Sequence, residues 1–330
     1  MTGDVTGRNR DVGRIALYSA IFALIAALVL VVWFQSGDGV PSASAEQETV
    51  LAELEAAAEP QNRTALQDGG IEPPQPDATE DFPAATTDAI RDEADRETPL
   101  PLIFTIVEEL SHDTAAFTQG LEIEDGRLYE STGLVGRSSI RELDITSGQV
   151  IRSLDVPDVF AEGLTVVDDT AIQITWQDEI AYRRNLSDFE IIETYEYEGQ
   201  GWGLCHDGDQ LVMSDGTSTL DFRDPDTFEV QSSIDVTFAG EPLEMLNELE
   251  CVNGTVWANI WLSSLIVEID PATGEVIGVL NATSLTPPSV NERDGAVLNG
   301  IAYDPSSDTF LLTGKLWPTI FRVQIQSGAE

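Results

Sequence analysis

A short motif recurs five times between residues 118 and 315, and this repeat limits what the chain can fold into more than any other feature of its sequence. Each copy opens with a polar or aromatic residue that is followed by Gly-Leu or a close variant. The openings are spaced 43, 40, 45 and 52 residues apart, at Gln119, Glu162, Trp202, Asn247 and Asn299. A regular period of this length is typical of stacked structural units.

The internal pattern of each copy is that of a β-hairpin. The first four copies close 14 residues after they open and the fifth closes 16 residues after, with a polar turn such as Asp125-Gly126 or Asn253-Gly254 between two apolar runs. A further apolar run then ends in an acidic turn, for example Asp270-Pro271-Ala272-Thr273-Gly274. Four short antiparallel strands fit each period and leave no room for crossover helices. The sequence therefore predicts an all-β domain, a five-bladed β-propeller.

The propeller geometry predicts where a site would lie. The innermost strands of a propeller line its axis, so equivalent positions of all repeats converge at one end of the channel. The five opening residues differ in chemistry, although the Gly-Leu beside them is nearly constant, and the closing positions include Trp176, Trp261 and Lys315. Variation at positions where packing alone would favour agreement indicates a functional site.

These stretches, taken in order, resemble the motifs of the glutamine cyclotransferase family of plants and bacteria. The matching segments are Phe117-Thr118-Gln119-Gly120-Leu121, Tyr129-Glu130-Ser131-Thr132-Gly133, Phe160-Ala161-Glu162-Gly163-Leu164-Thr165, Gly201-Trp202-Gly203-Leu204, Leu246-Asn247-Glu248-Leu249-Glu250, Leu298-Asn299-Gly300-Ile301 and Thr313-Gly314-Lys315-Leu316-Trp317-Pro318. The resemblance implies a five-bladed propeller that closes an N-terminal glutamine into pyroglutamate. It implies Glu162 as the acid/base residue, in a pocket formed by Phe117, Gln119, Phe160, Trp176, Trp202, Asn247, Trp261 and Lys315; Asn299 joins the set as an opening position.

The chemistry of cyclisation suits these residue types. The substrate's α-amine must be neutral to attack its own side-chain amide, and the departing ammonia needs a proton, so one carboxylate can take and return that proton. We expect Glu162 to do this with a pKa raised by burial. Asn247 and Lys315 are the candidate donors to the developing oxyanion, and the tryptophans form an aromatic cage that holds the reacting conformation.

The predicted activity is that of an acyltransferase, a glutaminyl-peptide cyclotransferase acting on peptides or proteins with N-terminal glutamine. Two alternatives stay open at this stage, because a propeller alone decides no function. One is a non-catalytic propeller that binds a peptide or another ligand, and the other is a metal-dependent propeller hydrolase.

The first hundred residues differ from the rest of the chain. Residues 15–34 are almost wholly apolar and long enough to cross a bilayer, and arginines precede them, so residues 1–14 are predicted to be cytoplasmic and the remainder extracytoplasmic. Residues 35–100 have the composition of an acidic spacer with a short helical stretch around Glu46 to Glu59, and residues 101–330 form the propeller. Cleavage after Ala45 is the alternative to a single-pass membrane anchor.

The net charge of the chain and its small number of histidines and cysteines limit which kinds of ligand it can bind. The chain has 59 acidic against 16 basic residues, of which Lys315 is the single lysine, and this excess argues against nucleic-acid binding. Two histidines and two cysteines supply a zinc site poorly, and no cofactor is expected to be required. A structural calcium on Glu248, Glu250 and Asp304 is a weaker expectation. Cys205 and Cys251 lie three and four residues after the opening positions of adjacent repeats, which favours a disulfide over two free thiols outside the cytoplasm.

Overall fold

A computed structural model of the chain describes residues 45–58, 98–291 and 295–328. Within these ranges the fold is all-β, as predicted, with helix α2 (Ala45–Ala57) and the single 3-10 turn η1 (Thr283–Leu285) as its helical elements. Helix α2 lies at the stretch predicted to be helical. The predicted membrane-spanning segment, residues 15–34, the cytoplasmic tail, the cleavage motif before Ala45 and most of the spacer fall outside the described residues. In the ranges that are described, no helix is long and apolar enough to cross a membrane.

Three of the repeats each form one four-stranded antiparallel sheet in simple meander order. The first contains β2 (Thr118–Glu124), β3 (Arg127–Thr132), β4 (Ser139–Leu143) and β5 (Val150–Asp155). The second contains β6 (Ala161–Val167), β7 (Thr170–Thr175), β8 (Ile180–Asn185) and β9 (Ile191–Glu196). The third contains β10 (Leu204–His206), β11 (Leu211–Ser214), β12 (Thr219–Arg223) and β13 (Val230–Asp235).

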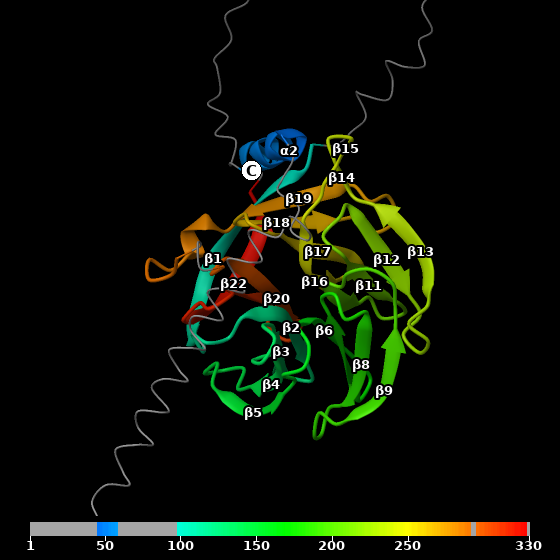
Figure 1. Cartoon of the computed structure of the whole chain (residues 1–330). Helices are drawn as coiled ribbons and strands as arrows, with labels where there is room; N and C mark the ends of the chain where they lie inside the picture. Colours follow the sequence, from blue (N-terminus) through cyan, green and yellow to red (C-terminus); the bar gives the residue numbers. More distant parts are fainter. Residues whose placement is uncertain (1–44, 59–97, 292–294, 329–330) are drawn as a thin grey trace, which may run out of the picture. The chain divides into compact units, whose positions relative to one another are not determined.

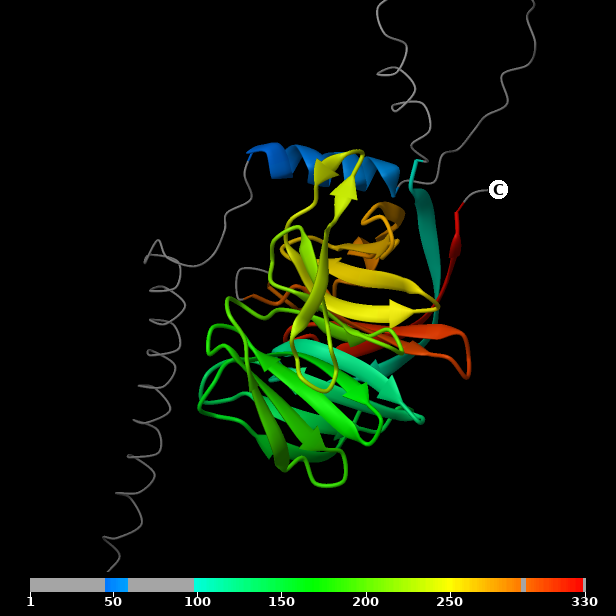
Figure 2. The same cartoon turned by 90° about the vertical axis from the view of Figure 1, so that its right-hand side faces the viewer.

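The fourth and fifth repeats share one eight-stranded sheet, which repeat spacing did not predict. Its members are β16 (Leu246–Val252), β17 (Thr255–Ile260), β18 (Leu265–Ile269), β19 (Val276–Asn281), β20 (Leu298–Asp304), β21 (Thr309–Gly314), β22 (Thr319–Ser327) and β1 (Leu100–Ser111). Strand β1 pairs antiparallel with β22 and, over Leu100 to Leu102, parallel with β19. The N-terminal strand of the domain thus completes the last repeat. A separate hairpin of β14 (Thr237–Phe238) and β15 (Glu241–Pro242) projects from the sheets (Figure 2).

The first strands of the five repeats form a closed ring. Strand β2 contacts β6, β6 contacts β10, β10 contacts β16, β16 contacts β20, and β20 contacts β2 again. Figure 1 views this ring nearly end-on, with β2, β6, β16 and β20 toward the middle and β5, β9 and β13 at the outside. In the second repeat the exposure of the strands increases outward: all seven residues of β6 are buried, whereas most of β9 is exposed.

The Gly-Leu of the repeats is explained by how closely the ring strands approach one another. A Cβ atom at Gly163 would lie 2.6 Å from the backbone nitrogen of Leu204, and one at Gly203 would lie 2.0 Å from the carbonyl oxygen of Asn247. Side chains are therefore excluded at the points where neighbouring ring strands come closest. In the fourth repeat Glu248 stands at this position, and its carboxylate accepts hydrogen bonds from the backbone N–H groups of Leu121 and Ile301.

The packing between repeats is apolar and nearly fully buried. One cluster under the last two repeats includes Trp257, Leu312 and Trp317, and another between the second and third repeats includes Ile172, Leu211 and Phe228. Such contacts lie between sheets and not only within them. They hold the starts of the ring strands at fixed mutual positions, which is what a site built from those starts requires.

Candidate active site

The opening residues of the repeats lie at equivalent points of the ring. Gln119, Glu162, Asn247 and Asn299 are each the second residue of a ring strand, and Trp202 precedes β10 by two residues; all five are buried. Three of them form a chain of hydrogen bonds. Asn299 Nδ2 donates to Gln119 Oε1 (3.3 Å), and Gln119 Nε2 donates to Glu162 Oε1 (2.9 Å). These opening residues therefore meet although as many as 180 positions separate them in sequence.

Glu162 has two unlike carboxylate oxygens. Oε1 accepts the hydrogen bond from Gln119, whereas Oε2 is buried without a hydrogen-bond partner among the described residues. Burial raises the pKa of Glu162 well above its usual value, and the charge of Lys315 opposes that rise. A protonated carboxyl would carry its proton on Oε2, because Oε1 faces a donor. Glu162 thus presents one oxygen that can give or take a proton.

Lys315 lies directly after β21 and is buried in the same region. Burial lowers the pKa of Lys315 to about 8, while the carboxylates of Glu162 and Glu248 raise it. Its Nζ lies 5.0 Å from the centroid of the Phe117 ring, within the range of a cation–π interaction. The ammonium group therefore lies over an aromatic ring and within the electrostatic influence of Glu162 and Glu248.

Asn247 and Asn299 each have a buried side-chain oxygen, Oδ1, without a hydrogen-bond partner in the described part of the chain. The sequence predicts Asn247 as a donor to the oxyanion. The unpaired atom in the structure is an acceptor, which matches N–H donors such as an amine or a primary amide. With Glu162 Oε2, the site therefore has three buried acceptor oxygens that could each accept a hydrogen bond from a ligand. Most buried polar atoms in proteins have a hydrogen-bond partner, so each of these three calls for an explanation.

The aromatic residues predicted to form a cage lie in two groups. Phe117 and Phe160 meet edge to face at 6.1 Å between ring centroids, and Phe160 meets Trp176 at 5.7 Å. Trp202 and Trp261 form a second edge-to-face pair at 5.2 Å. Every predicted pocket residue therefore contacts at least one other member of the set or carries an unpaired buried atom.

The predicted calcium ligands do not share a site. Glu248 accepts two backbone N–H groups, Glu250 accepts the N–H of Tyr303, and Asp304 is bound by Arg322, Ser306 and Ser307. Across the described ranges, no three His, Cys, Asp or Glu side chains are grouped so as to hold a metal ion. Burial raises the pKa of Glu248 and Glu250 well above their usual values and that of nearby Glu122 to about 8. The structural calcium stays a prediction.

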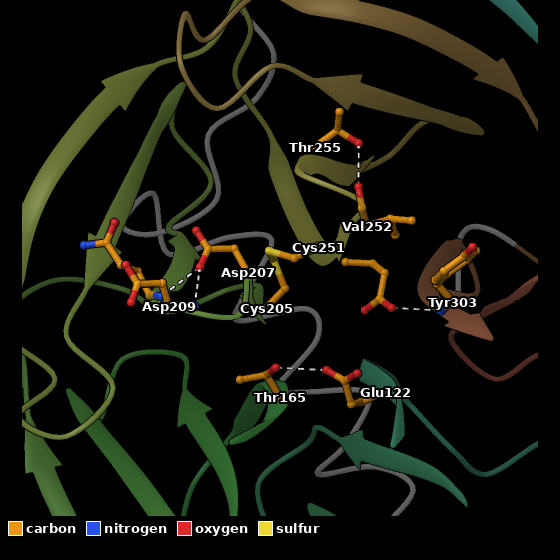
Figure 3. Close-up of a disulfide and its surroundings, with 11 residues drawn as sticks. Glu122, Thr165, Cys205, Asp207, Asp209, Cys251, Val252, Thr255 and Tyr303 are labelled. Atoms are coloured by element: carbon orange, nitrogen blue, oxygen red, sulfur yellow. Dashed lines mark hydrogen bonds between the residues drawn. A yellow bond between two sulfur atoms is a disulfide. The ribbon is translucent and has the colours of Figure 1, made fainter. Parts of the chain in front are cut away.

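Cys205 and Cys251 form a disulfide, as predicted from their similar places in adjacent repeats. It joins β10 to β16, neighbouring strands of the ring, with 5.5 Å between the two Cα atoms (Figure 3). Glu122, whose carboxylate accepts the Thr165 hydroxyl at 2.9 Å, appears in the same view. The disulfide links the third and fourth repeats a few residues beyond Trp202 and Asn247.

Two features of the site region were missed by reasoning from sequence. His112 Nε2 lies 2.8 Å from Glu130 Oε1, and both side chains are fully buried. Burial would raise the pKa of Glu130, but His112 and hydrogen bonds hold it below its usual value. The pair joins the end of β1 to β3; Glu130 stood within a recognised motif, but nothing local to the sequence indicated His112 as its partner.

The second missed feature is Gln200. Its Oε1 accepts the indole N–H of Trp176 (2.7 Å) and that of Trp202 (3.0 Å). Gln200 lies in the loop between β9 and β10, two residues before an opening position, where the repeat pattern offers no signal. Its place close to Trp202 is the single signal in the sequence that could have pointed to Gln200.

The buried carboxyl, the buried ammonium and the aromatic rings of this site all come from a segment that matches a known protein family. Residues 82–325 match the glutamine cyclotransferase family. The chain belongs to the glutamine cyclotransferase family. Its match thus covers all five repeats, and it begins before strand β1.

Two relatives extend this result. A glutaminyl-peptide cyclotransferase of Arabidopsis thaliana is 36% identical over 230 residues, which are 68% of this chain and 72% of the plant protein. The crystal structure of Myxococcus xanthus glutaminyl cyclase superposes with a TM-score of 0.66 at 40% identity, covering 69% of this chain and 99% of the bacterial one. The resemblance read from the motifs is therefore confirmed at the level of the family.

Proposed function

We propose that this member of the family is a glutaminyl-peptide cyclotransferase, an acyltransferase that converts N-terminal glutamine to pyroglutamate and releases ammonia. The observation that carries the proposal is Glu162, a buried carboxyl with a raised pKa and one unpaired oxygen beside Lys315 and the aromatic groups. A raised pKa brings the carboxyl nearer the working pH of a general acid/base.

In the proposed reaction, the α-amine nitrogen of the substrate attacks the Cδ atom of its own side-chain amide. The N–Cδ bond of the lactam forms, and the amine proton passes to Glu162 Oε2. The Cδ–Nε bond then breaks as Glu162 returns the proton to the leaving amide nitrogen, which departs as ammonia. Atoms and protons balance, so Glu162 ends the cycle in its starting state.

The neighbouring groups have complementary roles in this proposal. Lys315 stabilises the oxyanion that develops on the amide oxygen, since a preorganised cation in a water-poor site is most effective there. Asn247 Oδ1 and Asn299 Oδ1 accept N–H groups of the substrate's amine or amide. Gln119, held by Asn299, donates to Glu162 Oε1 and leaves Oε2 as the reacting oxygen.

We also infer that the ring of repeats is a five-bladed β-propeller, with β1 as the outer strand of the fifth blade. The closed order of contacts among the five first strands supports this architecture. Residues 15–34, from their length and flanking charges, are proposed as a membrane anchor that exports the domain.

The proposal is tested by ammonia release from Gln-Ala, with the peptide product identified by mass spectrometry. Wild type should turn the peptide over, and Glu162→Gln, which keeps the shape but not the acid, should lower kcat by about 10²- to 10⁴-fold. Glu122→Gln is the matched control: its carboxyl also has a raised pKa, and its amide can still accept the Thr165 hydroxyl. That control should stay within about threefold of wild type, a change of well under 1 kcal/mol.

The outcomes separate the two parts of the proposal. No turnover by the purified wild-type protein would overturn the activity itself. Full turnover by Glu162→Gln, with wild type active, would overturn Glu162 as the acid/base while leaving the activity in place.

A further inference from the structure

The two aromatic groups of the site come from different parts of the ring. Phe117, Phe160 and Trp176 stand at β2, β6 and the end of β7, and Lys315 covers the Phe117 ring at 5.0 Å. Trp202 and Trp261 stand before β10 and after β17. Ring contacts hold each group together internally, at 5.2 to 6.1 Å between centroids. The hydrogen bonds of Gln200 to Trp176 and Trp202 connect one group to the other.

The side-chain oxygen of Gln200 accepts two hydrogen bonds, which is the number its lone pairs allow. A side-chain amide oxygen has two lone pairs, and Oε1 of Gln200 accepts one indole N–H with each. The indole N–H is the only polar group of a tryptophan side chain, so each ring is anchored at one defined edge. One residue thus sets the orientation of two rings from two different sheets.

The backbone around the two tryptophans is already held by other contacts. Trp176 N donates to Phe160 O, Trp202 N donates to Ser214 O, and Gly201 N donates to Trp176 O, each within 3.0 Å. A Cβ atom at Gly216 would lie 2.6 Å from the Trp202 ring, so that ring lies directly on the Gly216 backbone. What Gln200 adds is therefore control of the rotation of the rings, and not of the path of the chain.

We propose that Gln200 is a positioning residue that joins the two aromatic groups into one continuous wall and so determines how the substrate glutamine is held. The inference rests on the proposed function for its substrate. Gln200 acts through Trp176 and Trp202, and has no part in proton transfer. Its effect belongs to binding, which the ground state and the transition state share.

The test compares Gln200→Leu, which removes the acceptor at similar volume, with Gln200→Glu, which keeps an acceptor oxygen. The leucine variant should raise KM for Gln-Ala about tenfold or more with kcat nearly unchanged, because two partly buried indole donors lose their partner. The glutamate variant should restore KM to within about threefold of wild type, a difference below 1 kcal/mol. A merely destabilised protein would lose active enzyme, and kcat would fall instead.

Gln210→Leu is the matched control. Gln210 is partly buried like Gln200, but its side chain binds Gln231 at the turn after β10, away from both tryptophans. This variant should leave KM and kcat within about twofold of wild type.

An independent readout follows the rings themselves. In ¹⁵N-labelled protein, Gln200→Leu should shift the indole N–H resonances of Trp176 and Trp202, whereas that of Trp317, which donates to Ala296 O, should stay in place. Unmoved resonances, or a Gln200→Leu enzyme with unchanged KM, would overturn the proposal. If wild type fails to turn over Gln-Ala, the proposed function fails, and the resonances alone decide whether Gln200 positions the two rings.

Discussion

At the scale of single residues, the charge of Lys315 depends on its burial in the site. Burial lowers the pKa of its ammonium to about 8, against the opposing effect of Glu162 and Glu248. Below that pH the ammonium is charged and can stabilise an oxyanion, and above it the charge is lost. In the proposed reaction the active form of Lys315 is the protonated one, so raising the pH through its lowered pKa removes that form.

This leads to a prediction for the pH profile of kcat/KM. In wild type the profile should fall above a pH of about 8 as Lys315 loses its proton. Lys315→Arg should have a lower maximum but no such fall up to pH 10, because a guanidinium stays charged. Because the α-amine of the substrate titrates identically in both assays, it cannot cause a difference between the two profiles. Superimposable alkaline limbs would contradict the assignment of this limb to Lys315.

At the scale of elements, the shortest ring strand is the one that is covalently tied. Strand β10 has three residues, compared with seven in β2, β6, β16 and β20, and pairs in its sheet with β11 alone. The disulfide from Cys205 to Cys251 connects it to β16, its neighbour in the ring. A short strand with few ladder hydrogen bonds gains most from such a link, which also lies near Trp202 and Asn247.

The disulfide should contribute measurably to stability. Its sequence separation is 46 residues, for which the chain-entropy argument gives about 4 kcal/mol in the free energy of unfolding. The double variant Cys205→Ser with Cys251→Ser should therefore unfold at a clearly lower urea concentration than the oxidised wild type. Reductant should shift the wild type toward the variant and leave the variant unchanged. Equal midpoints for variant and oxidised wild type would contradict the prediction.

At the scale of the whole molecule, a net charge of −43 opposes compaction. Few of the carboxylates have a cationic partner, since 16 basic residues face 59 acidic ones. The apolar contacts between sheets must overcome this repulsion. Strand β1 also helps to keep the domain compact, because its pairing with β22 brings the N-terminal and C-terminal strands of the domain into one sheet.

Salt should therefore stabilise the protein. Raising NaCl from 0.1 M to 1 M shortens the Debye length from about 10 Å to about 3 Å and weakens repulsion among surface carboxylates. The thermal unfolding midpoint should rise, and by more than it does in sucrose of equal osmolality, which stabilises without screening. A midpoint that falls with NaCl, or that rises equally in sucrose, would contradict the view that charge repulsion limits stability.

Several parts of the site were accessible from sequence because they recur locally. The opening residues precede a nearly constant Gly-Leu, and the two cysteines lie three and four residues after the openings of adjacent repeats, so alignment of the repeats was enough to single them out. The proposed calcium ligands were chosen by composition alone, and the structure gives each of them a different partner. The role expected of Asn247 as a donor was also reasoned without knowing which of its side-chain atoms is unpaired.

The number of repeats, their all-β character and the residues that open the repeats could be predicted from the amino-acid sequence, because all three follow from one motif that recurs along the chain. Only the tertiary structure decided that Glu162 Oε2 is the unpaired oxygen, that β1 completes the fifth repeat, and that Gln200 joins Trp176 to Trp202. The physical reason is distance along the chain. Hydrogen bonds between residues 24, 43 or 180 positions apart exist only once the ring has closed and fixed which side chains meet.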